Sequence, residues 1–164
     1  MRKRISFIEI AMILVMILLL LFFGLIFKKG NVLASIGICL SNLRQIGLAC
    51  GEYTQDYNGN FPERLLDLYP KYLSDYTKEC LACPGAHMEF MTPPPGEYAY
   101  KLPANFSEKD IDYLYTKGLT ENSPGKSILV QDKPGNHPQG IINVVYIDGQ
   151  VETINTRPWY KRNF

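Results

Sequence analysis

The sequence has no excess of charge of either sign. Its 164 residues include 17 Lys and Arg against 16 Asp and Glu, mixed along the chain, for a formal net charge of +1. Proteins that bind nucleic acid through its phosphates usually present a basic field, and this sequence contains no polybasic run that would create one. We therefore expect no nucleic-acid partner.

The motifs of common catalytic sites are also missing. No Ser-His-Asp grouping, glycine-rich phosphate loop or pair of catalytic carboxylates can be placed in the sequence. The histidines number only two. We therefore expect a protein that is not an enzyme and has no cofactor, no bound metal and no small-molecule substrate.

Charge is absent from one long stretch near the N-terminus. Residues 10–27 are eighteen consecutive uncharged residues, nearly all of them large and apolar. This length suffices to cross roughly 30 Å of hydrocarbon as a helix, and three basic residues before it against two after it favour a cytoplasmic N-terminus. We expect residues 1–29 to be an uncleaved single-pass anchor and residues 30–164 to form an exported head. A cleaved secretory signal is the alternative, although its apolar region would be shorter.

Beyond this stretch, an apolar residue recurs at alternating steps of four and three, which places these residues on one face of a helix. They are Val32, Ile36, Cys39, Leu43, Ile46, Cys50, Tyr53 and Tyr57. Asn58 and Gly59 supply the left-handed residues that end helices, and Pro62 prevents an early restart. The sequence therefore predicts one helix over about residues 5–57, half in lipid and half packed on the head. A coiled-coil dimer through the same face is the alternative.

The remainder of the head predicts short helices and antiparallel strands. Within residues 62–73, a short helix is expected that Pro62 starts and Pro70 ends, and a second is expected at 107–118, where Ser107 and Asp110 form a capping box. Strand patterns occur at 96–102, 127–132 and 142–154.

The last of these patterns is the clearest. It consists of two β-rich runs joined by Asp148 and Gly149, a pair that suits a tight primed turn. Three or four antiparallel strands packed against the apolar face of the helix would give an α+β fold.

Four cysteines lie in the expected head: Cys39, Cys50, Cys80 and Cys83. An even number in an exported domain favours disulfides. Cys39 and Cys50 are eleven residues apart on one helix, hence separated by roughly 16 Å, which is too far for a bond. Either each pairs with one member of the Cys80-x-x-Cys83 segment, in either order, or Cys80 and Cys83 pair with each other and leave two buried thiols. We expect at least one disulfide between the helix and this loop.

Metal binding and redox chemistry are alternatives for these cysteines. Zinc could recruit Cys80, Cys83, His87 and His137, although the second pair of ligands has no short regular spacing. Redox catalysis by a Cys-x-x-Cys segment needs a strand before it and a helix after it, whereas a proline and a glycine follow here. Calcium is a further alternative, but no ordered run of oxygen ligands is visible. Its ligands would be Asp132, Asp148 and carbonyls near Gly140.

Three segments together resemble one family. Residues 5–9, Ile-Ser-Phe-Ile-Glu, followed by the long apolar run, look like the prepilin N-terminal signature. Residues 39–62 are similar to the helix exit of bacterial pseudopilins of the type II secretion protein G kind, and residues 137–154 resemble their closing hairpin. The resemblance implies a pilin-like fold in the inner (cytoplasmic) membrane, with the head periplasmic or extracellular.

The resemblance gives Glu9 a definite role. In that family the apolar helices bundle in a filament, and this carboxylate pairs with the freed N-terminal amine of a neighbouring subunit. Such a pair relieves the cost of several kcal/mol that a lone charge has in hydrocarbon, so it selects one axial register. The implied function is that of a structural pseudopilin-like subunit of a secretion or pilus-type assembly. The implied partners are the membrane and other pilin-like subunits, identical or different.

The processing motif departs from the family at one position. The motif is formed by Arg4, Ile5, Ser6, Phe7, Ile8 and Glu9. The prepilin peptidase of the family cuts after a glycine, and Arg4 stands at that position. The alternative function is therefore an unprocessed, membrane-tethered binding module that does not polymerise, in which Glu9 lies at the cytoplasmic interface beside basic residues.

Overall fold

The protein is described here by a computed structural model that covers residues 7–90 and 101–157, with the backbone alone described at 25–31 and 88–90. The chain divides into two compact units, Met1–Ala34 and Ser35–Phe164. The predicted boundary between residues 29 and 30 lies within the first unit. Helices and an antiparallel sheet are both present, which confirms the predicted α+β class.

The long predicted helix is present as α1, Phe7–Asp56. Its end follows the predicted signal: Asn58 and Gly59 have φ values of 52° and 79°, and the Gly59 N–H donates to the Thr54 carbonyl at 2.8 Å. Two stretches of α1, Phe7–Gly24 and Val32–Asp56, are long and apolar enough to cross a membrane by length and composition.

Within the second unit, the C-terminal half of α1 forms the centre of the core. The side chains of Cys39, Leu43, Ile46 and Cys50 are all 0% exposed, which confirms that the predicted apolar face points inward. Tyr57 is 47% exposed. The buried face therefore ends with the helix.

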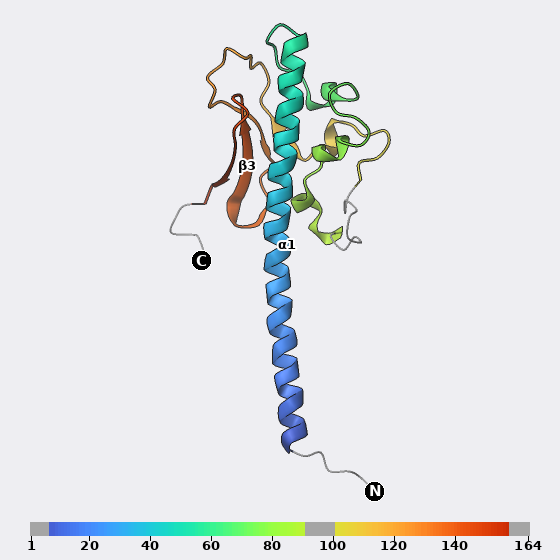
Figure 1. The fold of residues 1–164 in the computed structure, drawn as a ribbon, viewed down its shortest axis with the longest axis vertical. Helices are drawn as coiled ribbons and strands as arrows, with labels where there is room; N and C mark the ends of the chain where they lie inside the picture. The colour runs from blue at the N-terminus through green and yellow to red at the C-terminus, as the bar shows by residue number, and fades with distance from the viewer. Residues whose placement is uncertain (1–6, 91–100, 158–164) are drawn as a thin grey trace. The chain divides into compact units, whose positions relative to one another are not determined.

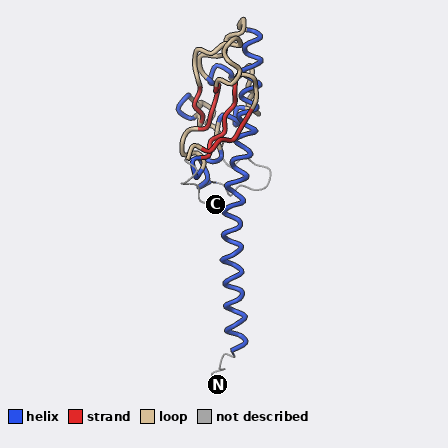
Figure 2. Tube along the Cα trace, turned by 90° about the vertical axis from the view of Figure 1, so that its left-hand side faces the viewer, coloured by secondary structure: helices blue, strands red, loops and turns tan. Residues whose placement is uncertain are grey.

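The sheet has four antiparallel strands in the order β1-β2-β3-β4. The strands are β1 Tyr113–Tyr115, β2 Ile128–Asp132, β3 Ile141–Tyr146 and β4 Val151–Asn155. Figure 1 and Figure 2 show the sheet alongside the part of α1 that belongs to the same unit. The contact is close, because a Cβ added at Gly47 of α1 would lie 2.9 Å from Cγ2 of Val145 in β3.

Loops and short 3-10 helices contact α1 as well. The described helices before the sheet are η1 Leu65–Leu68, η2 Lys78–Leu81, η3 Pro84–Phe90 and η4 Glu108–Asp110, and η5 Pro138–Gly140 precedes β3. Leu65, Leu68 and Leu81 are buried in the same core as Leu43 and Ile46. The core is therefore built from α1, the sheet and these loops together.

The closing hairpin is present, but its turn differs from the predicted one. Val145 pairs with Val151, and the Gly149 N–H donates to the Tyr146 carbonyl at 3.0 Å. A type I′ turn needs positive φ at both central residues, whereas here Gly149 has φ 78° and Asp148 does not have a positive φ. The loop consists of residues 147–149, and its last residue, Gly149, is the left-handed one, as is usual in three-residue hairpin connections.

Both predicted head helices are shorter than expected. The 62–73 segment contains only the 3-10 turn η1. In the 107–118 segment the Ser107–Asp110 capping box is present, but the helix stops at Asp110 and the chain continues as β1. The prediction of a helix here was wrong, because pairing with β2 recruits Tyr113–Tyr115 into the sheet. The expected strand at 96–102 lies mostly outside the described residues, and residues 101 and 102 are not in a strand.

The packing of α1 on β3 predicts opposite effects for two helix glycines. Gly51→Ala should raise the free energy of unfolding by about 0.5–1 kcal/mol, because alanine costs less conformational entropy in a helix and no atom lies within 4 Å of the added Cβ. Gly47→Ala should lower it by about 1–2 kcal/mol, because overpacking against Val145 outweighs the same gain.

Thermal unfolding of the full chain in detergent, followed by near-ultraviolet circular dichroism of the tyrosines, measures both variants. Gly51→Ala is the matched control, since it lies one helical turn from Gly47. Equal stabilisation by the two substitutions would show that α1 does not pack on β3.

Candidate functional site

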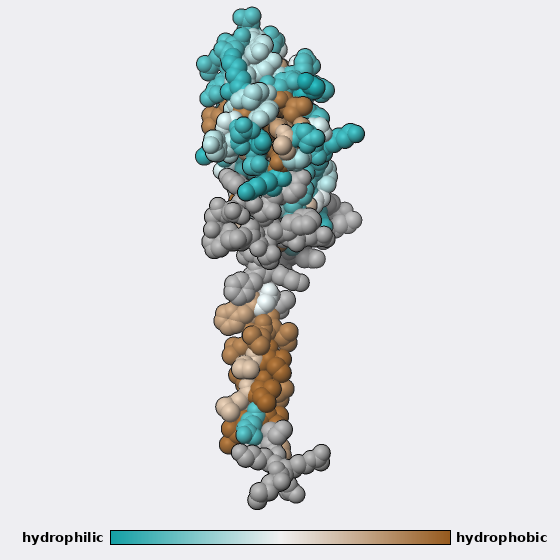
Figure 3. Space-filling view, turned by 90° about the vertical axis from the view of Figure 1, so that its right-hand side faces the viewer, coloured by the Kyte–Doolittle hydropathy of each residue, from teal (hydrophilic) through white to brown (hydrophobic). Residues whose placement is uncertain are grey.

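The first candidate site is the apolar N-terminal segment of α1. All eighteen residues of Phe7–Gly24 are exposed within their own unit, with 0% of the stretch buried. Figure 3 shows a hydrophobic surface over this segment. An apolar helix exposed on all sides is typical of a segment that lies in lipid or among other apolar helices.

Glu9 is the charged residue of this segment. It lies in the first turn of α1 with its side chain exposed. A carboxylate in a first turn interacts favourably with the helix dipole, which is a sufficient local reason for its presence in the helix. Phe7 and Ile8 of the predicted processing motif accompany it, while Arg4, Ile5 and Ser6 lie outside the described residues.

The second candidate site surrounds a disulfide. Cys39 of α1 is bonded to Cys83, with a Cα–Cα distance of 5.4 Å and 44 residues between the two in sequence. This confirms the predicted tie between the helix and the Cys80-x-x-Cys83 loop. A second bridge is not formed, because Cys50 and Cys80 are free.

Both free thiols are buried. Cys50 is 0% exposed and Cys80 is 3% exposed. Burial raises the pKa of the Cys80 thiol to about 12. Since the thiolate is the reactive form, the structure does not favour redox catalysis at Cys80.

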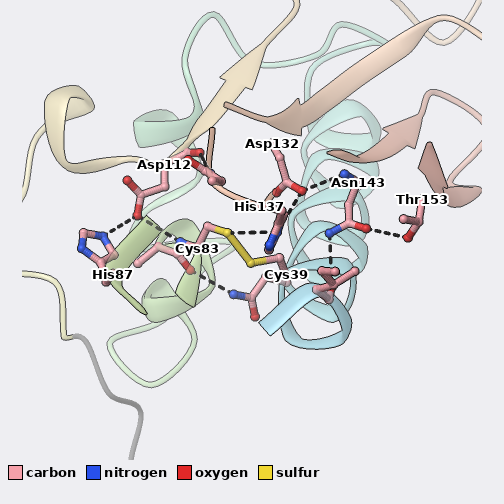
Figure 4. The surroundings of a disulfide bond; sticks show 12 residues. Cys39, Cys83, His87, Asp112, Asp132, His137, Asn143 and Thr153 are labelled. Carbon is pink, nitrogen blue, oxygen red and sulfur yellow. Dashed lines mark hydrogen bonds and ion pairs between the residues drawn. A yellow bond between two sulfur atoms is a disulfide. The ribbon is translucent and has the colours of Figure 1, made fainter. Parts of the chain in front are cut away.

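A buried histidine and a buried aspartate lie against the disulfide (Figure 4). His137 Nε2 is 3.2 Å from Asp132 Oδ2 and 3.5 Å from Cys83 Sγ. Asp132 is 0% exposed and His137 is 2% exposed. Together with Cys39 these residues place four potential ligand atoms within 4.8 Å of one another.

The position of Asp132 follows from the sheet. It ends β2 opposite Asn143 of β3, and its Oδ2 accepts the Asn143 N–H at 2.7 Å. The Asn143 side chain donates to the Ile36 carbonyl of α1 at 3.2 Å and accepts from the Thr153 hydroxyl of β4 at 2.6 Å. Asn143 therefore connects Asp132, the sheet and the helix in one network.

The loop that carries Cys83 is held on both sides. The Cys83 N–H donates to Asp112 Oδ2 at 3.0 Å, and the same oxygen lies 2.7 Å from His87 Nε2. On the side of α1, Asn42 Nδ2 donates to the Ala82 carbonyl at 3.0 Å. The sulfur of Cys83 is therefore fixed in position from both directions.

The structure brings together only part of each metal site considered from sequence. Cys83 and His137 meet, as the zinc alternative required, but His87 is engaged with Asp112 and Cys80 is not in the cluster. The calcium alternative fails among the described residues, because Asp132 lies opposite the start of β3 whereas Asp148 follows its end. Sequence reasoning missed the pairing of Asp132 with His137. The sequence did contain a signal for this pairing: Asp132 ends a predicted strand, and His137 follows five residues later in the loop after it.

In comparisons with known proteins, no protein-family model, no curated protein and no solved structure matches this chain.

The cysteine arrangement predicts a defined alkylation pattern. The folded, unreduced chain should not react at neutral pH, because Cys50 and Cys80 are buried and a thiol pKa of about 12 leaves very little thiolate. Unfolding without reduction should expose two thiols, and unfolding with reduction should expose four. Mass spectrometry of the digested protein should find Cys39 linked to Cys83.

A Cys80→Ala variant is the control for this experiment, since it should lose one label after unfolding and keep the Cys39–Cys83 link. A native bond between Cys80 and Cys83, or between Cys50 and Cys80, would contradict the structure. Replacing both Cys39 and Cys83 by serine should cost about 2–5 kcal/mol of stability, because the bond closes a long loop.

Proposed function

We propose that this chain is a structural, pseudopilin-like subunit of a secretion or pilus-type assembly, anchored in the inner membrane with its head on the periplasmic or extracellular side. The observation that carries the proposal is the change in burial along α1. Phe7–Gly24 is apolar and wholly exposed, whereas Cys39, Leu43 and Ile46 are wholly buried in the head. A helix with these two parts can enter a lipid or helical environment at one end while the other end holds a folded domain.

The arrangement of the second unit supports a pilin-like fold. A helix runs first in the chain, and an antiparallel meander whose last two strands form a hairpin follows and packs on it. This order agrees with the resemblance of residues 39–62 and 137–154 to pseudopilins. The fold by itself does not determine function, so the proposal depends equally on the N-terminal segment.

Glu9 is the residue that we assign to assembly. A carboxylate within an apolar segment costs several kcal/mol in hydrocarbon unless it meets a positive group. The N-terminal amine of a processed neighbour would be such a group. In this proposal the ion pair selects one axial stagger between adjacent apolar helices.

A second function is favoured by one specific observation, the presence of Arg4 where the family has its processing glycine. An unprocessed chain would keep its basic leader at the cytoplasmic surface and would lack the amine that Glu9 needs at Ile5. It would then serve as a membrane-tethered binding module with the same head.

Mass spectrometry of the N-terminus of the purified chain separates the two functions. We expect a chain that begins at Ile5, because assembly through Glu9 requires a free amine next to the apolar segment. An intact leader beginning at Met1 would favour the tether and count against the assembled subunit.

Crosslinking tests the role of Glu9 directly. A photoactivatable residue at Ala11 should capture a second apolar helix, either from another copy or from a different pilin-like chain identified by mass spectrometry. Glu9→Gln should reduce this capture by about tenfold or more, because losing an ion pair worth a little over 1 kcal/mol already has that effect.

Glu52→Gln is the matched control, because Glu52 is an exposed carboxylate on α1 within the head. It should leave the capture unchanged. Capture that persists in Glu9→Gln, or labelling of lipid alone, would rule out assembly through Glu9.

A further inference from the structure

Four buried side chains with metal-binding atoms converge from four different segments (Figure 4). Cys39 comes from α1, Cys83 from the loop after η2, Asp132 from the end of β2 and His137 from the loop before β3. We propose that the reduced form of this chain binds one zinc ion through Cys39, Cys83, His137 and Asp132. The site does not depend on whether the chain assembles.

The spacing of the donor atoms fits a tetrahedral ion. Bonds of about 2.3 Å to sulfur and about 2.05 Å to nitrogen or oxygen place a sulfur and a nitrogen ligand about 3.5 Å apart, and a nitrogen and an oxygen ligand about 3.3 Å apart. The corresponding distances here are 3.5 Å between Cys83 Sγ and His137 Nε2 and 3.2 Å between His137 Nε2 and Asp132 Oδ2. All four donor atoms lie within 4.8 Å of one another, and the two sulfurs, now bonded to each other, would have to separate.

The hydrogen bonding of the cluster is incomplete without an ion. Asp132 Oδ1 and His137 Nδ1 are buried, and neither has a hydrogen-bond partner among the described residues. Each such orphaned atom has lost its hydrogen bonds to water without replacement. A cation bound by the carboxylate would compensate for the first of these losses, because the charge of Asp132 would then face a positive partner.

The cluster also has the supporting contacts that orient metal ligands. The Asn143 N–H holds Asp132 Oδ2, and the carboxylate of Asp112 holds the backbone of Cys83. Gly85 lets the cysteine loop approach the imidazole, since an added Cβ would lie 2.6 Å from His137 Nδ1 and 2.4 Å from the Asn136 carbonyl oxygen.

The donor set favours zinc over calcium. Two thiolates and an imidazole are ligands that zinc accepts in closed, buried sites, whereas calcium takes six or more oxygen ligands. The net charge of two thiolates, one carboxylate and one zinc ion is −1, the same as that of two neutral thiols beside the carboxylate. Zinc that replaces the two thiol protons therefore adds no net charge to the buried site.

Cys39 and Cys83 can either form a disulfide or bind zinc as thiolates, but they cannot do both at once. A thiol reductant donates two electrons and two protons: the Cys39–Cys83 bond breaks, two thiols form, and the reductant becomes a disulfide. Zinc then replaces the two thiol protons, which pass to solvent. A small-molecule disulfide can reverse the change: it accepts two electrons and becomes two thiolates, the Cys39–Cys83 bond forms again, and the zinc ion is released.

The test uses the full chain in detergent, freed of metal by a chelator. One sample is kept oxidised and one is reduced anaerobically with a phosphine, which does not compete for zinc as dithiols do. Each is exposed to zinc and desalted, and its metal is counted by elemental analysis. The reduced chain should hold one zinc per chain and the oxidised chain none. Absence of zinc from the reduced chain, or equal uptake by both, would overturn the site.

Variants identify the ligands. His137→Gln should weaken zinc binding more than about 100-fold, since even changes in supporting residues cost 10–100-fold. Cys80→Ser is the matched control, because Cys80 lies outside the cluster, and it should bind zinc as the wild type does. Loss of zinc in Cys80→Ser with retention in His137→Gln would assign the metal to a different set of residues and refute the proposal.

A measurement on the unaltered chain tests the ligand set even if a variant fails to fold. X-ray absorption at the zinc edge of the reduced, zinc-loaded protein should report two sulfur and two nitrogen or oxygen ligands. Three or four sulfur ligands, or none, would show that zinc is held elsewhere.

Discussion

The head depends on the burial of one face of α1 between the sheet and the loop that carries Cys83. Leu43 and Ile46 are fully buried there, and each such side chain contributes about 1.5–3 kcal/mol when removed from water. The approach is close enough that Gly47 has no room for a side chain beside Val145. Since the sheet and the loops both pack on α1, neither could keep its apolar surface from water without that helix.

This constraint explains which elements sequence could predict. The helical face, the helix end at Asn58 and Gly59, and the closing hairpin are encoded by local spacing and turn residues, and all three are present. The segment at Tyr113–Tyr115 was predicted as helix because a capping box precedes it. In the structure this segment pairs with β2 instead, and Tyr113 lies opposite Asp132. This pairing joins two segments that are far apart in the sequence, so no local sequence pattern predicts it.

The buried cluster shows the same limit. Helix geometry excluded a bond between Cys39 and Cys50, and a tie between the helix and the cysteine loop was expected beside the alternative of a Cys80–Cys83 bond. The residues that surround Cys83 could not be predicted in this way, because their spacing in the sequence grouped Cys83 with Cys80 and His87. In the fold, Asp112 holds His87, and the sheet register brings Asp132 and His137 to the disulfide instead. A ligand set drawn from a helix, a strand end and two loops has no linear signature.

The two apolar stretches of α1 pass the same test of length and composition for opposite physical reasons. In Val32–Asp56 a third of the stretch is buried within the protein, and charged residues such as Arg44 and Glu52 occupy its exposed side. Protein atoms therefore already cover its apolar face, and lipid would have to accommodate the charges. Phe7–Gly24 is 0% buried, and all of its residues apart from Glu9 are uncharged, so it has no comparable division into a covered apolar face and a charged face. Of the two stretches, Phe7–Gly24 is therefore the one in which length, composition and exposure together fit a membrane span.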